Sequence, residues 1–327
     1  MCGIVGYVGF RDSVPIILDS LRRLEYRGYD SAGIAVIDAE GALVGSKAEG
    51  KLGRLADRLG SEPLHGTIGL GHTRWATHGR PSDANAHPHL DCSGKIAVIH
   101  NGIIENYESL RERLRAAGHT FRSETDTEVL AHLIEANDDG DVIAALRKTL
   151  EQVTGAYAVG VISSDEPDRL LFARNGASPL VVGIGENEMF VASDTPAILQ
   201  YTRKQVILHE GEMVVVDKDG YRLMDFAGRP IEREVTQVMW DASSAEKDGF
   251  KHFMLKEMFV QPNVVKETLA GRIDEVGDSQ LAAELKIDEY MLRAITKISI
   301  TGCGTALHAG MVGMYLLRAL CKLPVEM

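Results

Sequence analysis

The sequence lacks several features that define other classes of protein. It contains no stretch of about 18 uncharged apolar residues and no basic region followed by an apolar segment at its start, so neither a membrane-spanning helix nor a secretory signal is predicted. Its four cysteines include no CxxC pair, which gives no indication of a disulfide framework or a zinc site. Its 35 lysines and arginines form no dense run among 47 acidic residues, which disfavours nucleic acid as a partner. These absences predict a cytosolic protein.

The residues that are present suit a globular chain of about two domains. Apolar residues make up 45% of the 327 positions, enough to build hydrophobic cores. Short apolar strands are predicted near residues 2–8, 33–38, 67–71 and 95–99, helices near 13–26, 105–117 and 125–135, and closely spaced strands from 155 to about 216. Two sheets between layers of helices, an α+β fold, suit this order better than one parallel sheet.

Two of the predicted helices have recognisable starts. Ser13 is placed to cap the first helix, with Pro15 in its first turn. Residues 125–128 read Thr-Asp-Thr-Glu, the pattern of a capping box, and indicate the start of a later helix.

A polar stretch divides the chain. We predict one domain over residues 2–226, a linker over 227–249 and a second domain over 250–327. The second domain ends with an apolar strand, a glycine-rich turn at 301–305 and the start of a helix. A lone strand, turn and helix cannot cover its own sheet face, so we expect this α/β domain to be truncated.

Cys2 directly follows the initiator methionine. Removal of that methionine would leave Cys2 with a free α-amine, whose pKa of about 7.7–8.0 allows it to accept the proton of a thiol with a pKa of about 8.5. Nucleophile and base would then belong to one residue, as in enzymes with an N-terminal nucleophile. Taken alone, the position favours a small buried residue in a strand.

Five segments together resemble class II glutamine amidotransferases, and they occur in that family's order: residues 2–6, 23–33, 72–79, 100–106 and 123–128. The resemblance implies a four-layer αββα N-terminal-nucleophile hydrolase sandwich. It also implies hydrolysis of L-glutamine to glutamate and ammonia through a thioester on Cys2.

The segments at 27–30 and 302–305 resemble the branch of this family that passes the ammonia to fructose-6-phosphate and forms glucosamine-6-phosphate. Residues 250–327 would then be the start of a sugar-isomerase (SIS) domain, and the parent enzyme would be a homodimer. Asparagine synthetase and the purine amidophosphoribosyltransferase share the cysteine at the start, but the partial sugar-isomerase segment argues against both.

The resemblance implies roles for four residues that contact glutamine. Arg74 would bind the α-carboxylate, Asp126 the α-ammonium group, and Asn101 with Gly102 would form the oxyanion hole. Each residue also has a plainer explanation. Arg74 could form a surface ion pair, Asp126 could complement a helix dipole, and the Asn-Gly pair could be a turn.

Residues 73–81 resemble the loop that closes over bound glutamine in this family. Thr77 and His78 would add contacts and Trp75 would act as a lid, although core packing for Trp75 and a surface position for His78 are the alternatives. His87 and His89 have the HxH spacing of metal ligands, but no third ligand is near in the sequence. No metal or cofactor is therefore predicted.

In the second domain, the resemblance implies that Cys303, Gly304 and Thr305 line a fructose-6-phosphate site, where N–H groups at the start of a helix could hold the phosphate. Ala306 stands where the family often has serine, which removes one hydroxyl donor. A competing hypothesis is a catalytically silent phosphosugar-binding or regulatory module. It predicts sugar-phosphate binding without glutamine turnover, and none of the five segments looks degraded enough to favour it.

Overall fold

A computed structural model describes residues 2–239, 250–270 and 288–327. Its contacts divide the chain into two units, Met1–Glu246 and Lys247–Met327, which are described separately below. Among the described residues, no helix combines the length and the apolar character needed to span a bilayer.

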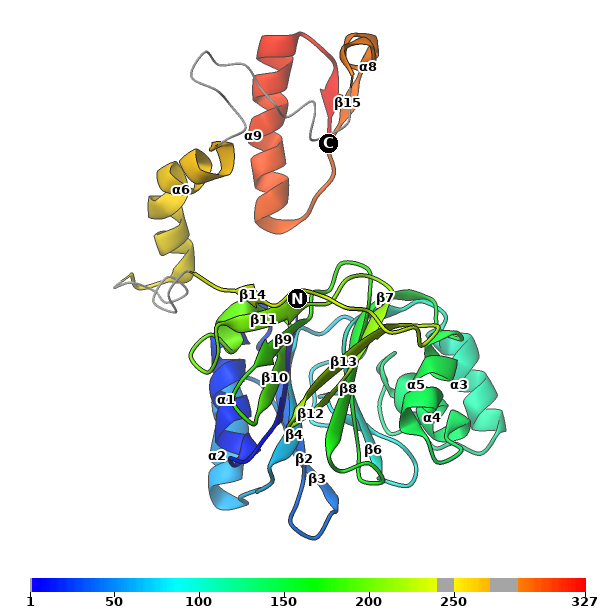
Figure 1. Cartoon of the computed structure of the whole chain (residues 1–327). Coiled ribbons are helices and arrows are strands. Elements are labelled where there is room, and N and C mark those ends of the chain that lie inside the picture. The colour runs from blue at the N-terminus through cyan, green and yellow to red at the C-terminus, as the bar shows by residue number, and fades with distance from the viewer. Residues whose placement is uncertain (1, 240–249, 271–287) are drawn as a thin grey trace. The chain divides into compact units, whose positions relative to one another are not determined.

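Two antiparallel sheets form the centre of the first unit (Figure 1). The eight-stranded sheet has the order β14 (Thr236–Gln237), β11 (Lys204–Ile207), β9 (Val181–Ile184), β10 (Met189–Ala192), β1 (Gly3–Val8), β4 (Ile68–Arg74), β2 (Ser31–Ile37) and β3 (Leu43–Glu49). The six-stranded sheet has the order β13 (Gly220–Asp225), β12 (Glu212–Asp217), β8 (Arg169–Asn175), β7 (Gly155–Ser163), β6 (Ile96–Ile104) and β5 (His89–Leu90).

Helices cover the outer face of each sheet, as Figure 1 shows. The apolar faces of α1 (Ser13–Leu24) and α2 (Leu52–Ser61) pack on the eight-stranded sheet. Those of α3 (Tyr107–Ala116), α4 (Glu128–Asn137) and α5 (Val142–Leu150) pack on the six-stranded sheet. A third hydrophobic cluster fills the space between the sheets. The order of layers is helix, sheet, sheet, helix, which confirms the predicted α+β sandwich.

Phe172 on β8 shows how closely the two sheets approach. Its fully buried ring lies between Gly6 of β1 and Gly160 of β7, where an added Cβ would come within 2.5 Å and 2.6 Å of ring atoms. Burial of such a side chain contributes about 1.5–3 kcal/mol, and the two glycines leave the room that the ring needs. This packing fixes the position of β1, the strand that directly follows Cys2.

Both predicted helix caps are wrong. Asp12, and not Ser13, accepts the Val14 N–H at the start of α1. Helix α4 begins at Glu128 without a side-chain cap, because the Glu128 carboxylate accepts the N–H groups of two preceding residues and the Thr125 hydroxyl pairs with a histidine on β5. Tertiary partners have replaced the local hydrogen bonds that the pattern predicted.

The polar stretch between β13 and residue 239 packs against the rest of the first unit. Ile231 packs against the core between the sheets, Arg233 pairs with Glu212 at 2.6 Å, and β14 pairs with β11. Residues 240–249, the second part of the predicted linker, lie outside the described residues. The domain boundaries at 226 and 249 stay a prediction.

The second unit contains α6 (Phe253–Leu269), α8 (Glu289–Ala294), β15 (Ile298–Ser299), α9 (Gly304–Cys321) and β16 (Val325–Glu326). Strand β15 pairs in parallel with β16, and α9 connects the two, so the predicted strand, glycine-rich turn and helix are present. Helix α9 buries none of its side chains, and Met311, Tyr315 and Leu320 on it are exposed.

Candidate active site

Cys2 lies directly before β1, which pairs with β10 on one side and β4 on the other. Its Sγ accepts the backbone N–H of Trp75, just beyond the end of β4, at 3.1 Å. Burial raises the pKa of the Cys2 thiol, whereas the Trp75 N–H and the positive charges of Arg74 and Arg27 act in the opposite direction. The sulfur is therefore held in a fixed place beside groups that favour its thiolate form.

A cavity of about 270 Å³ opens beside this sulfur. Its volume lies just below the range of drug-sized sites and suits a small metabolite. The residues that line it are Cys2, Arg27, Arg74, Trp75, Thr77, His87, His100, Asn101, Gly102, Ile103, Asp126, Thr127 and Ser178. Seven of the eight residues that sequence analysis proposed for the glutamine site thus meet in one cavity. His78 does not line it.

Asn101 is held by hydrogen bonds on both sides of its amide. The Nδ2 group donates to the carbonyl oxygen of Cys2 at 3.0 Å, which places Oδ1 toward Nε2 of His72, 2.9 Å away. Because Nε2 also faces the carbonyl oxygen of His100 at 3.0 Å, it must carry the proton and donate it. Burial lowers the pKa of His72 to about 3, so the ring is neutral. One Nδ2 hydrogen of Asn101 stays available to a ligand in the cavity.

Gly102 continues β6 and is not part of a turn, since residues of β6 as far as Ile104 pair with β7. Its φ of +126° is rarely adopted by residues with a side chain, and an added Cβ would lie 2.0 Å from the carbonyl oxygen of Ala156. Only glycine suits this position. The Asn-Gly turn considered from the sequence is therefore wrong.

Arg74 and Asp126 give the cavity one cationic and one anionic group, each with a side chain buried from solvent. Nη2 of Arg74 donates to the carbonyl oxygens of His78 and Gly79, and Nη1 has no hydrogen-bond partner among the described residues. Oδ2 of Asp126 accepts the Ile104 N–H at 2.9 Å. The open Nη1 of Arg74 and the carboxylate of Asp126 line the same cavity, which suits a ligand that carries one negative and one positive group.

The loop after β4 is fastened at several points. The Ala76 N–H donates to Oδ2 of Asp30 at 2.9 Å, and the ring of Trp75 packs edge-on against Tyr29 with the centroids 5.6 Å apart. The Trp75 side chain is 45% exposed, which excludes the core position that was the alternative. His78 packs against the ring of Tyr107, outside the cavity lining.

The histidines that suggested a metal have other partners. Nδ1 of His87 accepts the His100 N–H at 3.2 Å, and Nε2 of His89 lies 3.0 Å from the Thr125 hydroxyl. The ring of His87 also stacks on His72. These contacts connect the two sheets at the base of the cavity.

Sequence analysis missed several residues of this site. Three of them lie inside the family-like segments, although nothing in the sequence singled them out as cavity residues: Arg27, His100 and Thr127. Ser178 lies outside all five segments, and nothing in the sequence indicated it. In the second unit, Cys303 is the residue directly before α9, and Gly304 and Thr305 are the first residues of that helix. All three are exposed.

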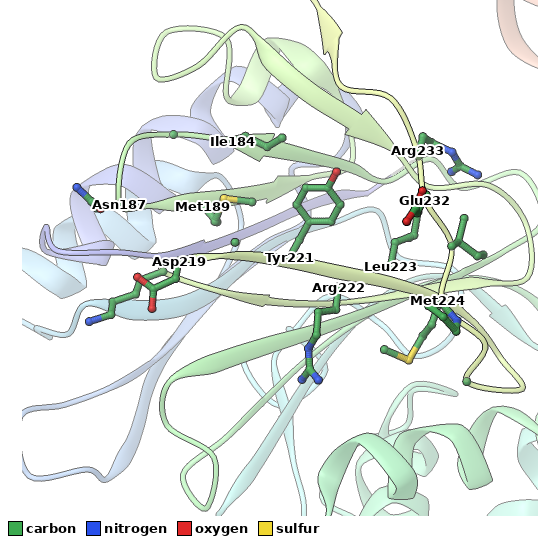
Figure 2. A pocket seen from close by; sticks show the side chains of 16 residues that line it. Ile184, Asn187, Met189, Asp219, Tyr221, Arg222, Leu223, Met224, Glu232 and Arg233 are labelled. Atoms are coloured by element: carbon green, nitrogen blue, oxygen red, sulfur yellow. The ribbon is translucent and has the colours of Figure 1, made fainter.

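A larger hollow of about 930 Å³ lies elsewhere on the first unit, along β13 and the segment that follows it (Figure 2). Figure 2 shows Tyr221 and Arg222 pointing to opposite sides of β13. Arg233 in its lining is paired with Glu212, and its lining holds no cysteine, serine or histidine. The smaller cavity at Cys2 is therefore the better candidate for chemistry.

Comparison with known proteins gives consistent results. Residues 72–200 match the model of a glutamine amidotransferase domain. The chain is 53% identical to a glutamine–fructose-6-phosphate aminotransferase [isomerizing] of Thermus thermophilus and 48% identical to that of Symbiobacterium thermophilum. In both alignments, the whole of this chain covers 53% of the relative. The chain spans about half the length of the curated relatives it matches.

A solved structure is similar as well. The glutamine phosphoribosylpyrophosphate amidotransferase from B. subtilis, complexed with ADP and GMP, has a TM-score of 0.61 and 28% sequence identity, over 69% of this chain and 49% of that chain.

Proposed function

We propose that this chain, a member of the amidotransferase family that includes the glutamine–fructose-6-phosphate aminotransferases, hydrolyses L-glutamine to glutamate and ammonia through Cys2. The observation that carries the proposal is the single cavity in which the Cys2 sulfur meets Arg74, Asn101 and Asp126. These side chains supply a nucleophile, a carboxylate receptor, an oxyanion donor and an ammonium receptor. Few substrates other than a small amino acid with a side-chain carbonyl need all four.

In the proposed reaction, the α-amine of Cys2 takes the thiol proton and the sulfur attacks the side-chain amide carbon of glutamine. The carbonyl oxygen becomes an oxyanion, which accepts hydrogen bonds from Nδ2 of Asn101 and the Gly102 N–H. The carbon–nitrogen bond then breaks as the ammonium of Cys2 gives its proton to the departing amide nitrogen, which leaves as ammonia and leaves a thioester on Cys2. Water hydrolyses the thioester and releases glutamate and the thiol.

Arg74 and Asp126 would hold the two charges of the substrate's amino-acid end. The forked guanidinium suits a planar carboxylate, and its unpartnered Nη1 gains a hydrogen bond when glutamine binds. Thr77 and Trp75 on the loop after β4 would contact the bound amino acid and exclude water, with His78 supporting the loop from outside the cavity lining.

The direct test is a glutaminase assay on purified chain whose intact mass shows that Met1 has been removed. We expect glutamate and ammonia in equal amounts, and covalent labelling of Cys2 by a diazo ketone analogue of glutamine. Cys2→Ser should lose turnover, while Cys321→Ser should retain it. A chain that retains Met1 should also be inactive, because the Cys2 nitrogen is then a peptide nitrogen and cannot act as base. Equal turnover by folded Cys2→Ser and parent would refute the proposal.

We further propose that, within a longer chain, the ammonia reaches fructose-6-phosphate and yields glucosamine-6-phosphate. Support comes from sequence identity that extends through both units, including the turn at Cys303, Gly304 and Thr305. The present chain should make glutamate but no glucosamine-6-phosphate when both substrates are supplied. A chain extended to the length of its relatives should make both, and should be a homodimer by light scattering.

A further inference from the structure

Four side chains with metal-binding atoms meet outside the candidate active site. Cys92 lies in the turn between β5 and β6, and His119 follows α3. His132 and Glu135 are three residues apart on α4 and share one face of that helix. The four donor atoms all lie within 4.8 Å of one another. Because three separate segments supply them, the spacing of cysteines in the sequence gave no sign of the cluster.

Four distances between the donor atoms are close to those of tetrahedral coordination. Sγ of Cys92 lies 3.6 Å from Nδ1 of His119 and 3.5 Å from Nδ1 of His132. Oε2 of Glu135 lies 3.0 Å and 3.3 Å from the same two nitrogens. Zinc bonds of about 2.3 Å to sulfur and about 2.0–2.1 Å to nitrogen and oxygen place tetrahedral donors about 3.6 Å and about 3.3 Å apart. Four of the six donor pairs have nearly these separations, and all six lie within 4.8 Å, so the donors need only a small rearrangement to surround an ion.

The carboxylates around His132 would also stabilise a bound cation. The side chain is 1% exposed, and its Nε2 faces a carboxylate oxygen of Glu128 at 3.6 Å, which favours the proton on Nε2. Nδ1 lies 3.3 Å from the carboxylate of Glu135, which already accepts the Cys92 N–H at 3.1 Å. A proton on Nδ1 or a bound cation between these atoms satisfies both groups. Carboxylates behind a histidine ligand are the usual outer partners of zinc sites.

We propose that Cys92, His119, His132 and Glu135 bind one Zn²⁺ ion in a closed tetrahedral site. A thiolate and two imidazoles suit zinc, whereas Mg²⁺ and Ca²⁺ prefer oxygen ligands. Four protein ligands leave no open position, so the ion has a structural role. Binding displaces the thiol proton of Cys92 into solvent, and the Thr120 N–H, 3.4 Å from Sγ, stabilises the resulting thiolate.

The site would join the β5–β6 turn, the segment after α3 and helix α4. That segment leads from His119 to Asp126, which lines the cavity at Cys2. Zinc would thus fix one wall of the cavity from behind without contacting a substrate.

The test uses the full chain carrying Cys2→Ser, so that the active-site thiol does not contribute metal binding. The protein is stripped with a chelator and titrated with Zn²⁺ and, separately, with Co²⁺. We expect one zinc per chain by elemental analysis, a rise in the thermal midpoint, and the visible absorption of tetrahedral Co²⁺ with a thiolate charge-transfer band. Cys92→Ser and His119→Ala should weaken zinc affinity more than about 100-fold.

Cys321→Ser and His65→Ala are matched controls, because both positions are exposed and lie outside the cluster. They should keep the affinity and the cobalt spectrum of the parent. Circular dichroism of each variant without metal shows whether it folds. The proposal is overturned if the parent binds no more zinc than folded His119→Ala, or if the cobalt spectrum lacks the thiolate band. Because the readout is metal binding, a negative result leaves the glutaminase proposal unaffected.

Discussion

A buried histidine determines which way the amide of Asn101 points. His72 lies on β4, in the opposite sheet from Asn101, and donates one N–H to two oxygens. The carbonyl oxygen of Cys2 holds the other end of the same amide. An amide rotated by half a turn would place its oxygen where the oxyanion forms and would repel it. His72 is therefore a positioning residue for the proposed reaction.

Replacing His72 tests this arrangement. His72→Phe keeps the ring but removes the donor, so we expect kcat for glutamine hydrolysis to fall about 10–100-fold, less than the 10²–10³ typical of losing the oxyanion donor itself. KM should change little, since the glutamine receptors are untouched. His72→Gln can present an N–H from a similar distance and should recover part of the rate. A change in KM with kcat preserved would contradict the role.

Gly102→Ala tests the backbone donor. The new Cβ would collide with the Ala156 carbonyl oxygen and occupy a φ that residues with a side chain rarely adopt, so the N–H must move. We expect kcat to fall about 10²–10³-fold. Gly118→Ala is the matched control, because its φ is +101° and an added Cβ meets nothing within 4 Å. It should lose some stability and keep kcat, and an equal loss of kcat in both variants would argue against a specific donor at Gly102.

The strands and helices themselves were largely predictable. The apolar runs at β2, β4 and β6 predicted these strands, because a buried strand has apolar residues at alternate or at successive positions. The capping box at residues 125–128 failed because Thr125 and Glu128 find partners in distant segments, which no local pattern encodes. For the same reason, the sequence segments that line the cavity could be predicted, but the contact between His72 and Asn101 could not. That contact depends on how two strands of different sheets are aligned.

The loop after β4 offers a prediction about an element as a whole. Its Ala76 N–H is held by the Asp30 carboxylate, which belongs to the turn before β2. A hydrogen bond to a charged group contributes about 1.5–3 kcal/mol. In Asp30→Ala the loop should lose this anchor, and we expect KM for glutamine to rise about tenfold. Asp30→Asn keeps an acceptor and should restore much of the affinity.

Asp38→Ala controls for the general cost of removing an aspartate that binds backbone N–H groups. Oδ1 of Asp38 accepts two N–H groups in the β2–β3 turn, remote from the cavity lining. Its KM should equal that of the parent in steady-state assays. If Asp30→Ala and Asp38→Ala give the same KM, the loop does not depend on this anchor.

The sandwich as a whole places uncharged histidines where its two sheets meet. His72, His87, His89 and His100 are each at most 4% exposed. Burial lowers the pKa of His72 to about 3, and it lowers the pKa of the other three as well. In the unfolded chain each would bind a proton near pH 6.5. The unfolded state therefore takes up more protons than the folded state as the pH falls below that value.

The sign of this difference predicts a protein that loses stability in mild acid. For a histidine with a lowered folded pKa, the free energy of unfolding falls as the pH drops from about 6.5 toward the folded pKa, by at most about 1.4 kcal/mol per pH unit for each group. Urea unfolding followed by circular dichroism between about pH 7.5 and about pH 5 measures the slope. His87→Asn keeps an acceptor for the His100 N–H but removes one titrating ring, so the slope should decrease by up to that amount. A His87→Asn slope equal to the parent's would contradict the role of this buried ring in the acid response.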